Sequence, residues 1–262
     1  MNPLPHSAGL GAHAVTISRV ADNQWHAIEN DLVVGRGHAS RRLDGRTFLS
    51  IDTWRDEVFD RLASAMLTDQ PAPRYTVVDE TDNELTAKWA RAGFVIGRRE
   101  SEFAVPTDSP IVEPRSAGVT IVSGDDVAEA PLRELDRAIR AEVEATAGWQ
   151  TMPAEVLPWQ GGTWPIDPRT YTVAVRDGRY VGLVRVATRT RRPRIGLVAV
   201  VAAEQRRGIA RALLSEVLDG LHRSGAEAAT AEVDETNTAA MALFGGIGER
   251  TGGSLELVSG KA

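Results

Sequence analysis

The stretch with the clearest chemical potential is residues 205–211, Gln-Arg-Arg-Gly-Ile-Ala-Arg. It contains one glycine and three arginines at a point where an apolar run gives way to an amphipathic segment. The first N–H groups of a helix have no partner within it and lie at the positive end of its dipole, so they can bind a phosphate or pyrophosphate. Gly208 has no Cβ to keep such a ligand away from the backbone. The residue types therefore predict a phosphate-binding turn.

Two elements must position this turn. The apolar residues 197–201 predict a buried strand before it. After it, Ile209, Leu213, Val217 and Leu221 recur every four residues, which is the spacing of one apolar helix face. We therefore expect the order strand, turn and helix.

This order resembles motif A of the GNAT N-acyltransferase superfamily, Gln/Arg-x-x-Gly-x-Gly/Ala, which Gln205, Gly208 and Ala210 fill. A predicted strand, residues 229–233, and an Asn-x-x-Ala helix follow, and the resemblance covers residues 118–259. It implies an α/β (α+β) fold with a mixed, mostly antiparallel sheet flanked by helices. It also implies acyl transfer from acetyl-CoA, as co-substrate, to an amine.

The resemblance assigns the acyl-CoA contacts to the end of the fourth strand, the turn and one asparagine. In the family, free backbone groups of that strand pair with the pantetheine amides. Asn237 could bond the pantetheine arm through its carboxamide, or it could cap the next helix, and the two roles are compatible. The implied contacts are Val198, Ala199, Val200, Gln205, Arg206, Arg207, Gly208, Ile209, Ala210, Arg211 and Asn237.

The proton-transfer groups are less clear from the sequence. An ammonium must lose a proton before it attacks, and a carboxylate can accept that proton. Glu232 on the fifth strand is the candidate base by position, with Glu142, Glu144 and Asp167 as further options. The family often has a tyrosine where this chain has Phe244, which cannot donate a proton. The protein is therefore either an enzyme whose thiolate product is protonated otherwise, or a non-catalytic acyl-CoA-binding sensor or scaffold.

The acceptor region is expected in the irregular segment 146–168. Trp149, Trp159 and Trp164 could form apolar walls around a cationic substrate, or could simply pack a long loop. With Glu142 they are the candidate acceptor contacts. We expect the acceptor to be a small amine such as an amino sugar, a polyamine or an amino acid derivative. The alternative is a protein N-terminus or lysine.

The two halves of the chain are related. Val-Asp-Glu-Thr occurs at 78–81 and again at 233–236, an offset of 155, and the apolar helix positions agree at that offset. The first half is shorter where the second has its turn, and it has Thr53 there with Asp52 and Asp56 close by. The two carboxylates would repel pyrophosphate. We therefore expect a tandem protein with a degenerate first half. The predicted parts are a flexible tail (1–13), a degenerate GNAT-like domain (14–105), a linker (106–117) and an acyl-CoA-binding GNAT domain (118–262).

Composition narrows the class of protein. With 30 Lys and Arg against 36 Asp and Glu the net charge is −6, which does not favour nucleic-acid binding. The chain has no cysteine, and its five histidines show no metal spacing, so we expect neither a disulfide nor a metal site. The first residues lack the basic head and apolar core of a signal peptide, and no run is long enough to span a membrane. A cytoplasmic monomer or homodimer is expected.

Overall fold

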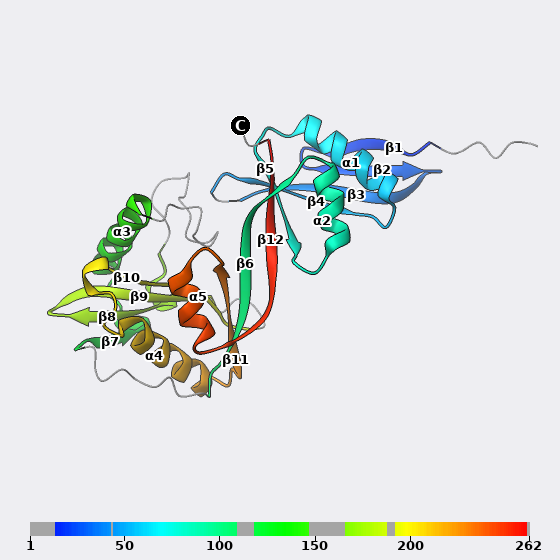
Figure 1. Ribbon diagram of the computed structural model, residues 1–262. Helices are drawn as coiled ribbons and strands as arrows, with labels where there is room; N and C mark the ends of the chain where they lie inside the picture. Colours follow the sequence, from blue (N-terminus) through cyan, green and yellow to red (C-terminus); the bar gives the residue numbers. More distant parts are fainter. Residues whose placement is uncertain (1–13, 43, 109–117, 147–165, 188–191, 261–262) are drawn as a thin grey trace, which may run out of the picture.

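The computed structural model describes residues 14–42, 44–108, 118–146, 166–187 and 192–260 (Figure 1). The first half supplies β1 (Thr16–Ala21), β2 (Gln24–Glu29), β3 (Leu32–Arg41), β4 (Thr47–Asp52), α1 (Asp56–Asp69), β5 (Arg74–Asp79), α2 (Asn83–Arg91) and β6 (Val95–Pro106). The second half supplies β7 (Thr120–Ser123), α3 (Glu129–Ala145), β8 (Tyr171–Arg176), β9 (Arg179–Ala187), β10 (Arg194–Val200), α4 (Ile209–Arg223), β11 (Ala228–Asp234), α5 (Thr238–Gly245) and β12 (Glu249–Ser259). Short 3-10 turns η1 (Gly124–Asp126), η4 (Pro168–Thr170) and η5 (Ala202–Glu204) lie between them.

The described strands form one sheet in which the halves exchange their last strands. The strand order is β1-β2-β3-β4-β5-β12-β6-β11-β10-β9-β8-β7. Strand β12 ends the second half but pairs with β5 of the first, and β6 ends the first half but pairs with β11 of the second. The two long strands also pair with each other, antiparallel, and join the halves (Figure 1).

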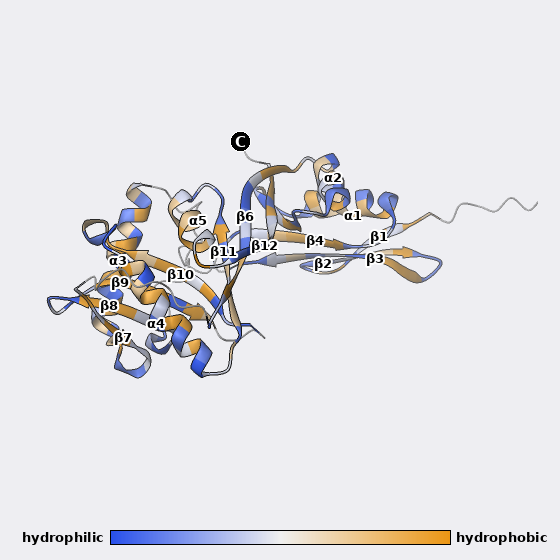
Figure 2. Cartoon of the chain, turned by 60° about the horizontal axis from the view of Figure 1, so that its bottom comes forward, coloured by the Kyte–Doolittle hydropathy of each residue, from blue (hydrophilic) through white to orange (hydrophobic). Residues whose placement is uncertain are grey.

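Helices cover the two halves differently. In the first half, α1 and α2 lie on the same face, and the described residues place no helix on the other (Figure 2). In the second half, α4 packs over β9 to β11 on one face, in the core that contains Leu213 and Ala231. Helix α3 packs on the opposite face, in a separate core with Leu132 and Leu183. Only the second half is therefore a sheet with helices on both faces.

The expected duplication is present in atomic detail. The Asp79 carboxylate accepts bonds from the N–H and hydroxyl of Thr81, at 2.8 and 2.5 Å. Asp234, 155 residues later, binds Thr236 at the same two distances. The following helices begin alike, since Asp82 caps α2 and its counterpart Asn237 caps α5.

Some expected boundaries change. Strand β6 runs unbroken over Val95–Pro106, although residues 97–102 in its middle are mostly polar. Polar residues fit in the middle of this central strand because ionic partners satisfy them. Thr107, expected in the linker, donates its N–H to the carbonyl of Glu227. The tail 1–13 and most of the linker lie outside the described residues, and the domain boundaries stay a prediction.

Candidate functional site

The site begins where two parallel strands of the second half diverge. Strands β10 and β11 share one register pair, Arg194 with Thr230. The other edge of β10 stays paired with β9 up to Val200, although an irregularity between Ile195 and Leu197 shifts the register. Backbone groups of β10 beyond Arg194 therefore face the opening instead of a ladder on that side. An extended ligand with amide groups could pair with this edge as an added strand.

The turn after β10 presents a helix N-terminus to the same opening. Gly208 is the N-cap of α4 and has φ of 83°, a left-handed conformation that glycine adopts without strain. Its carbonyl accepts the N–H of Ala212, so the N–H groups of the three residues between them precede the first helical bond. The side chain of Gln205 donates to the carbonyl of Val200 at 3.0 Å and ties the turn to the strand.

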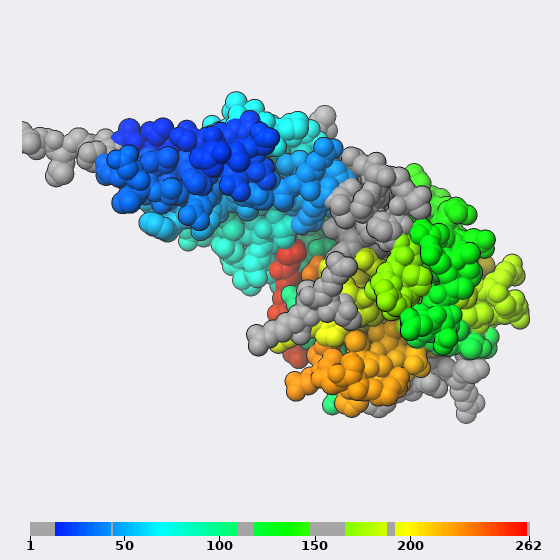
Figure 3. All heavy atoms as spheres, turned by 180° about the vertical axis from the view of Figure 1, so that it is seen from behind, coloured from blue at the N-terminus to red at the C-terminus, as the bar shows by residue number. Residues whose placement is uncertain are grey.

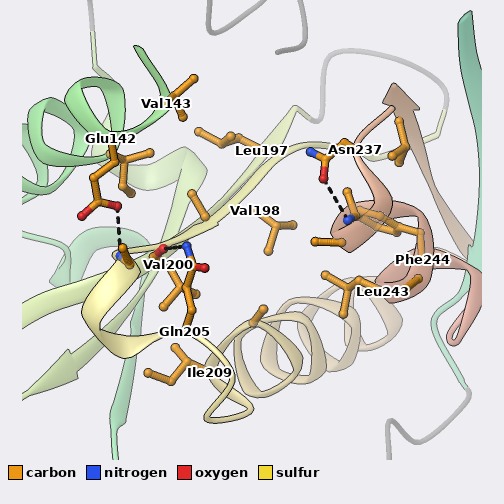
Figure 4. A pocket seen from close by; sticks show the side chains of 18 of the residues that line it. Glu142, Val143, Leu197, Val198, Val200, Gln205, Ile209, Asn237, Leu243 and Phe244 are labelled. Carbon is orange, nitrogen blue, oxygen red and sulfur yellow. Dashed lines mark hydrogen bonds between the residues drawn. The ribbon is translucent and has the colours of Figure 1, made fainter. Parts of the chain in front are cut away.

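Two carboxylates, one on α3 and one in η5, hold the turn in place. Glu142 of α3 accepts the backbone N–H of Ala202 at 2.9 Å (Figure 4). Glu204 is ion-paired with Arg176 and lies 3.5 Å from Arg207. Glu142 was expected to contact the acceptor; its carboxylate binds the backbone of the turn, and the acceptor contact stays a prediction.

The opening is a cleft of about 1200 Å³. Helix α3, the end of β10, the turn, β11 and α5 all contribute walls, so the cleft joins the Gly208 turn to the diverging strands (Figure 4). Its walls include every acyl-CoA contact that the resemblance implied, as well as Glu142, Glu232 and Phe244. The sequence therefore predicted residues that the fold brings together. The space-filling view shows that the molecule is hollowed between the two halves, with atoms of β12 visible there (Figure 3).

Asn237 and Phe244 lie on α5 at the β11 side of the cleft (Figure 4). The Asn237 side-chain oxygen accepts the N–H of Ala240 at 3.1 Å, which confirms the expected cap. The carboxamide NH2 group is left to donate to a ligand. Phe244 is buried, and its ring lies 6.1 Å from that of Phe103. The corresponding position of the first half holds the buried Trp89.

A strip of charged side chains lies beside the cleft. Arg194 binds Glu232 at 2.6 Å. The buried Arg98 bridges Asp234, at 3.1 Å, and Glu100, at 2.5 Å. Burial raises the pKa of Glu100, Arg98 opposes the rise, Glu232 adds to it, and Arg194 and Asp234 have smaller effects of opposite sign. Sequence reasoning missed Glu100, because only the exchange of strands brings this first-half residue to β11.

The remaining candidates fall elsewhere. Trp149, Trp159 and Trp164 lie outside the described residues. Glu144 is exposed on α3, and Asp167 caps η4 by accepting the N–H of Arg169.

Within the described residues no group of three or more His, Asp or Glu is arranged to hold a metal ion. None of the helices in the described part of the chain is long and apolar enough to cross a membrane.

The corresponding turn of the first half is built differently. Only Thr53 to Arg55 separate β4 from α1, and the Thr53 hydroxyl donates to the carbonyl of Val34 at 3.0 Å. The first turn of α1 carries Asp56 and Glu57. These carboxylates disfavour a bound pyrophosphate at this helix N-terminus.

A family model matches the part of the chain that forms the cleft. Residues 135–248 match the family model described as "Acetyltransferase (GNAT) family". This part of the chain is a GNAT domain. The matched residues contain the turn, the diverging strands and α5, so the family's sequence features occur where the cleft lies. A search of curated proteins finds no match to it.

Solved GNAT structures share the fold of almost the whole chain. A GCN5-related N-acetyltransferase from Sphaerobacter thermophilus is 16% identical with a TM-score of 0.64, covering 92% of this chain and 82% of that one. A tandem GNAT protein from the clavulanic acid biosynthesis pathway is 15% identical with a TM-score of 0.58, covering 91% and 83%. A glucosamine N-acetyltransferase region of a fungal multi-domain β-N-acetylglucosaminidase is 12% identical with a TM-score of 0.62, covering 90% of this chain and 32% of that one.

Proposed function

We propose that this GNAT protein transfers an acetyl group from acetyl-CoA to the amine of a small molecule. One observation carries the proposal: the diverging ends of β10 and β11 open into the cleft that also contains the Gly208 turn. The turn fits the pyrophosphate, and the free edge of β10 fits the amides of the pantetheine arm. The thioester then lies between the two strands.

The chain's residues have separate tasks in this reaction. The turn, held by Gln205 and Glu142, binds the phosphate end of the co-substrate. Backbone N–H groups of β10 polarise the thioester carbonyl and stabilise the oxyanion that forms on it. The Asn237 amide donates to the pantetheine arm. Phe244 supplies an apolar wall, so water protonates the departing thiolate, which with a thiol pKa of about 8.5 leaves readily.

A small acceptor is supported by two of the structural neighbours. One belongs to the clavulanic acid biosynthesis pathway, and the other is a glucosamine N-acetyltransferase region. We extend this chemistry to an amino sugar, a polyamine or an amino acid derivative. Trp149, Trp159 and Trp164, which follow α3 in the sequence, stay the predicted acceptor contacts.

A second candidate is an acyl-CoA-binding protein without turnover. It is favoured by Phe244, because a phenyl ring replaces the usual proton donor of the family. The two functions separate in one assay that follows free thiol release from acetyl-CoA with a panel of small amines, with mass spectrometry of the products. Acetylated amine supports the enzyme. Stoichiometric binding of acetyl-CoA without thiol release supports the sensor, and acetylation of peptides alone would point to a protein acceptor.

The location of binding is tested by a matched pair of substitutions. Gly208→Asp places a carboxylate beside the phosphates and should abolish acetyl-CoA binding in calorimetry. Thr53→Asp makes the comparable change in the first half and should leave binding intact. Two acetyl-CoA molecules per chain would contradict a site confined to the second half.

A further inference from the structure

Strand β6 brings first-half residues to the edge of the cleft. It pairs with β11 so that Glu100 is opposite Asp234 and Glu102 is opposite Glu232. Directly opposed side chains lie on the same face of a sheet, with Cβ atoms about 5 Å apart. Phe103 on β6 points into the core under α4, so Glu100 and Glu102 point to the other face, which is the α3 face. Because Asp234 lines the cleft, Glu100 is one strand spacing away from it.

The two β11 carboxylates at this edge, Asp234 and Glu232, each have an arginine as ionic partner. Asp234 is almost completely buried, accepts both bonds from Thr236 through Oδ1 and is paired with Arg98 through Oδ2. Glu232 is paired with Arg194 at 2.6 Å. Both carboxylates are therefore already engaged by an arginine.

Glu100 is fixed by an ion pair but remains partly exposed to solvent. Its side chain is 20% exposed, and Arg98 binds Oε1 at 2.5 Å. Within the described residues Arg98 is the one hydrogen-bond partner of this carboxylate, which leaves Oε2 available. Arg98 in turn is fixed by the buried Asp234, so the position of Glu100 is set from two strands.

We propose that Glu100, on the strand donated by the first half, accepts the proton of the substrate ammonium in the active site of the second half. This inference rests on the proposed acetyl transfer to an amine. It gives the first half a chemical task although its own turn does not suit a phosphate.

The proton balance is complete. The ammonium passes one proton to the Glu100 carboxylate, and the neutral amine attacks the thioester carbonyl carbon to form the C–N bond. The C–S bond then breaks with its electron pair on sulfur. The second proton leaves the nitrogen to water, and water protonates the thiolate. Glu100 returns its proton to solvent. The products are the amide, the free thiol of CoA and one released proton.

The surroundings of Glu100 suit a base. Burial and nearby carboxylates raise its pKa, and a carboxylate of higher pKa takes a proton from an ammonium more readily. Its β12 neighbour in the ladder is the uncharged Ser254. The charged groups near it are Asp234 and Glu232 from β11, Arg194 from β10 and Arg98 from its own strand. Arg42, which follows β3, also interacts with it electrostatically.

The test compares Glu100→Gln with Glu102→Gln, which makes the same change on the same strand and face. With an amine that the wild type acetylates, Glu100→Gln should lower kcat by about 100-fold or more, in the range of general-base effects. It should also remove the acid limb of the kcat/KM profile, which in the wild type lies above the ordinary Glu range. Glu102→Gln should keep both within about twofold. Acetyl-CoA affinity and melting temperature should stay unchanged in both variants.

The conservative variant separates chemistry from packing. Glu100→Asp keeps the carboxylate, so it should retain the acid limb while lowering kcat. If the wild type is active and Glu100→Gln keeps both its kcat and its acid limb, Glu100 is not the base, but the proposed function stands. The same conclusion follows if Glu232→Gln, and not Glu100→Gln, loses the acid limb. Failure of the wild type to acetylate any amine would overturn the proposed function together with this inference.

Discussion

The capping residue of α5 offers a sharp test, because the duplication supplies its control. Asn237 accepts the N–H of Ala240 through its side-chain oxygen, and Asp82 does the same for Leu85 in the first half. The two caps have nearly the same backbone angles, with φ of −82° in both and ψ of 77° and 75°. They should therefore contribute equally to stability.

The magnitudes follow from what each variant removes. Replacing either cap with alanine should cost about 1 kcal/mol of unfolding free energy. In a chain of this size that loss lowers the melting temperature by about 2–4 °C. Asn237→Asp keeps the oxygen acceptor and should cost little stability, but it removes the NH2 donor. One lost hydrogen bond of about 1–1.5 kcal/mol corresponds to roughly tenfold weaker acetyl-CoA binding.

The assay is calorimetric acetyl-CoA binding beside thermal unfolding of Asn237→Ala, Asn237→Asp and Asp82→Ala. We expect both alanine variants to lose similar stability and only the two Asn237 variants to lose affinity. Unchanged affinity in Asn237→Asp would show that Asn237 is a helix cap and nothing more. Weaker binding in Asp82→Ala would show that the first half contributes to the co-substrate site.

Three further expectations concern single positions. Gly208→Ala and Gly225→Ala, at φ of 83° and 86° on opposite ends of α4, should each cost about 1 kcal/mol in urea unfolding, but only Gly208→Ala should weaken acetyl-CoA binding in calorimetry. Arg98→Met should lower the unfolding free energy by about 3 kcal/mol, because it leaves the buried Asp234 without its ionic partner; a loss below 1 kcal/mol would contradict this. Phe244→Tyr should leave kcat equal or higher, because it adds a proton donor; a large fall in kcat at unchanged acetyl-CoA affinity would show that the phenyl ring is needed for packing.

Local sequence patterns predicted the cleft well. The strand, turn and helix around Gly208 depend on nearby residues, since apolar periodicity and one glycine at positive φ are enough to define them. The cap at Asn237 also follows from local chemistry, because a short polar side chain before a helix accepts one of its free N–H groups. The repeated Val-Asp-Glu-Thr segment predicted two matching turns for the same reason.

Pairing between distant strands was not predictable in this way. Each half reads as a complete sequence of elements, so nothing local indicates that β6 and β12 change places. No local feature marks the polar stretch around Arg98 and Glu100 as a central strand, because its partner Asp234 lies more than 130 residues away in the sequence. Ionic pairing with β11 makes that stretch a central strand, and the same pairing places Glu100 beside Asp234, which lines the cleft.

The exchange of strands also explains why a half without a phosphate-binding turn remains necessary. Leu255 and Leu257 of β12 are buried in the core of the first half. Phe103 and Val105 of β6 are buried in the core of the second half, against the helix that follows the turn. Burial of such side chains contributes about 1.5–3 kcal/mol each, so either half alone would lose several kcal/mol and expose an unpaired strand edge. The first half can therefore lack a turn that suits a phosphate without becoming dispensable, because the cleft of the second half is built on a sheet that the first half completes.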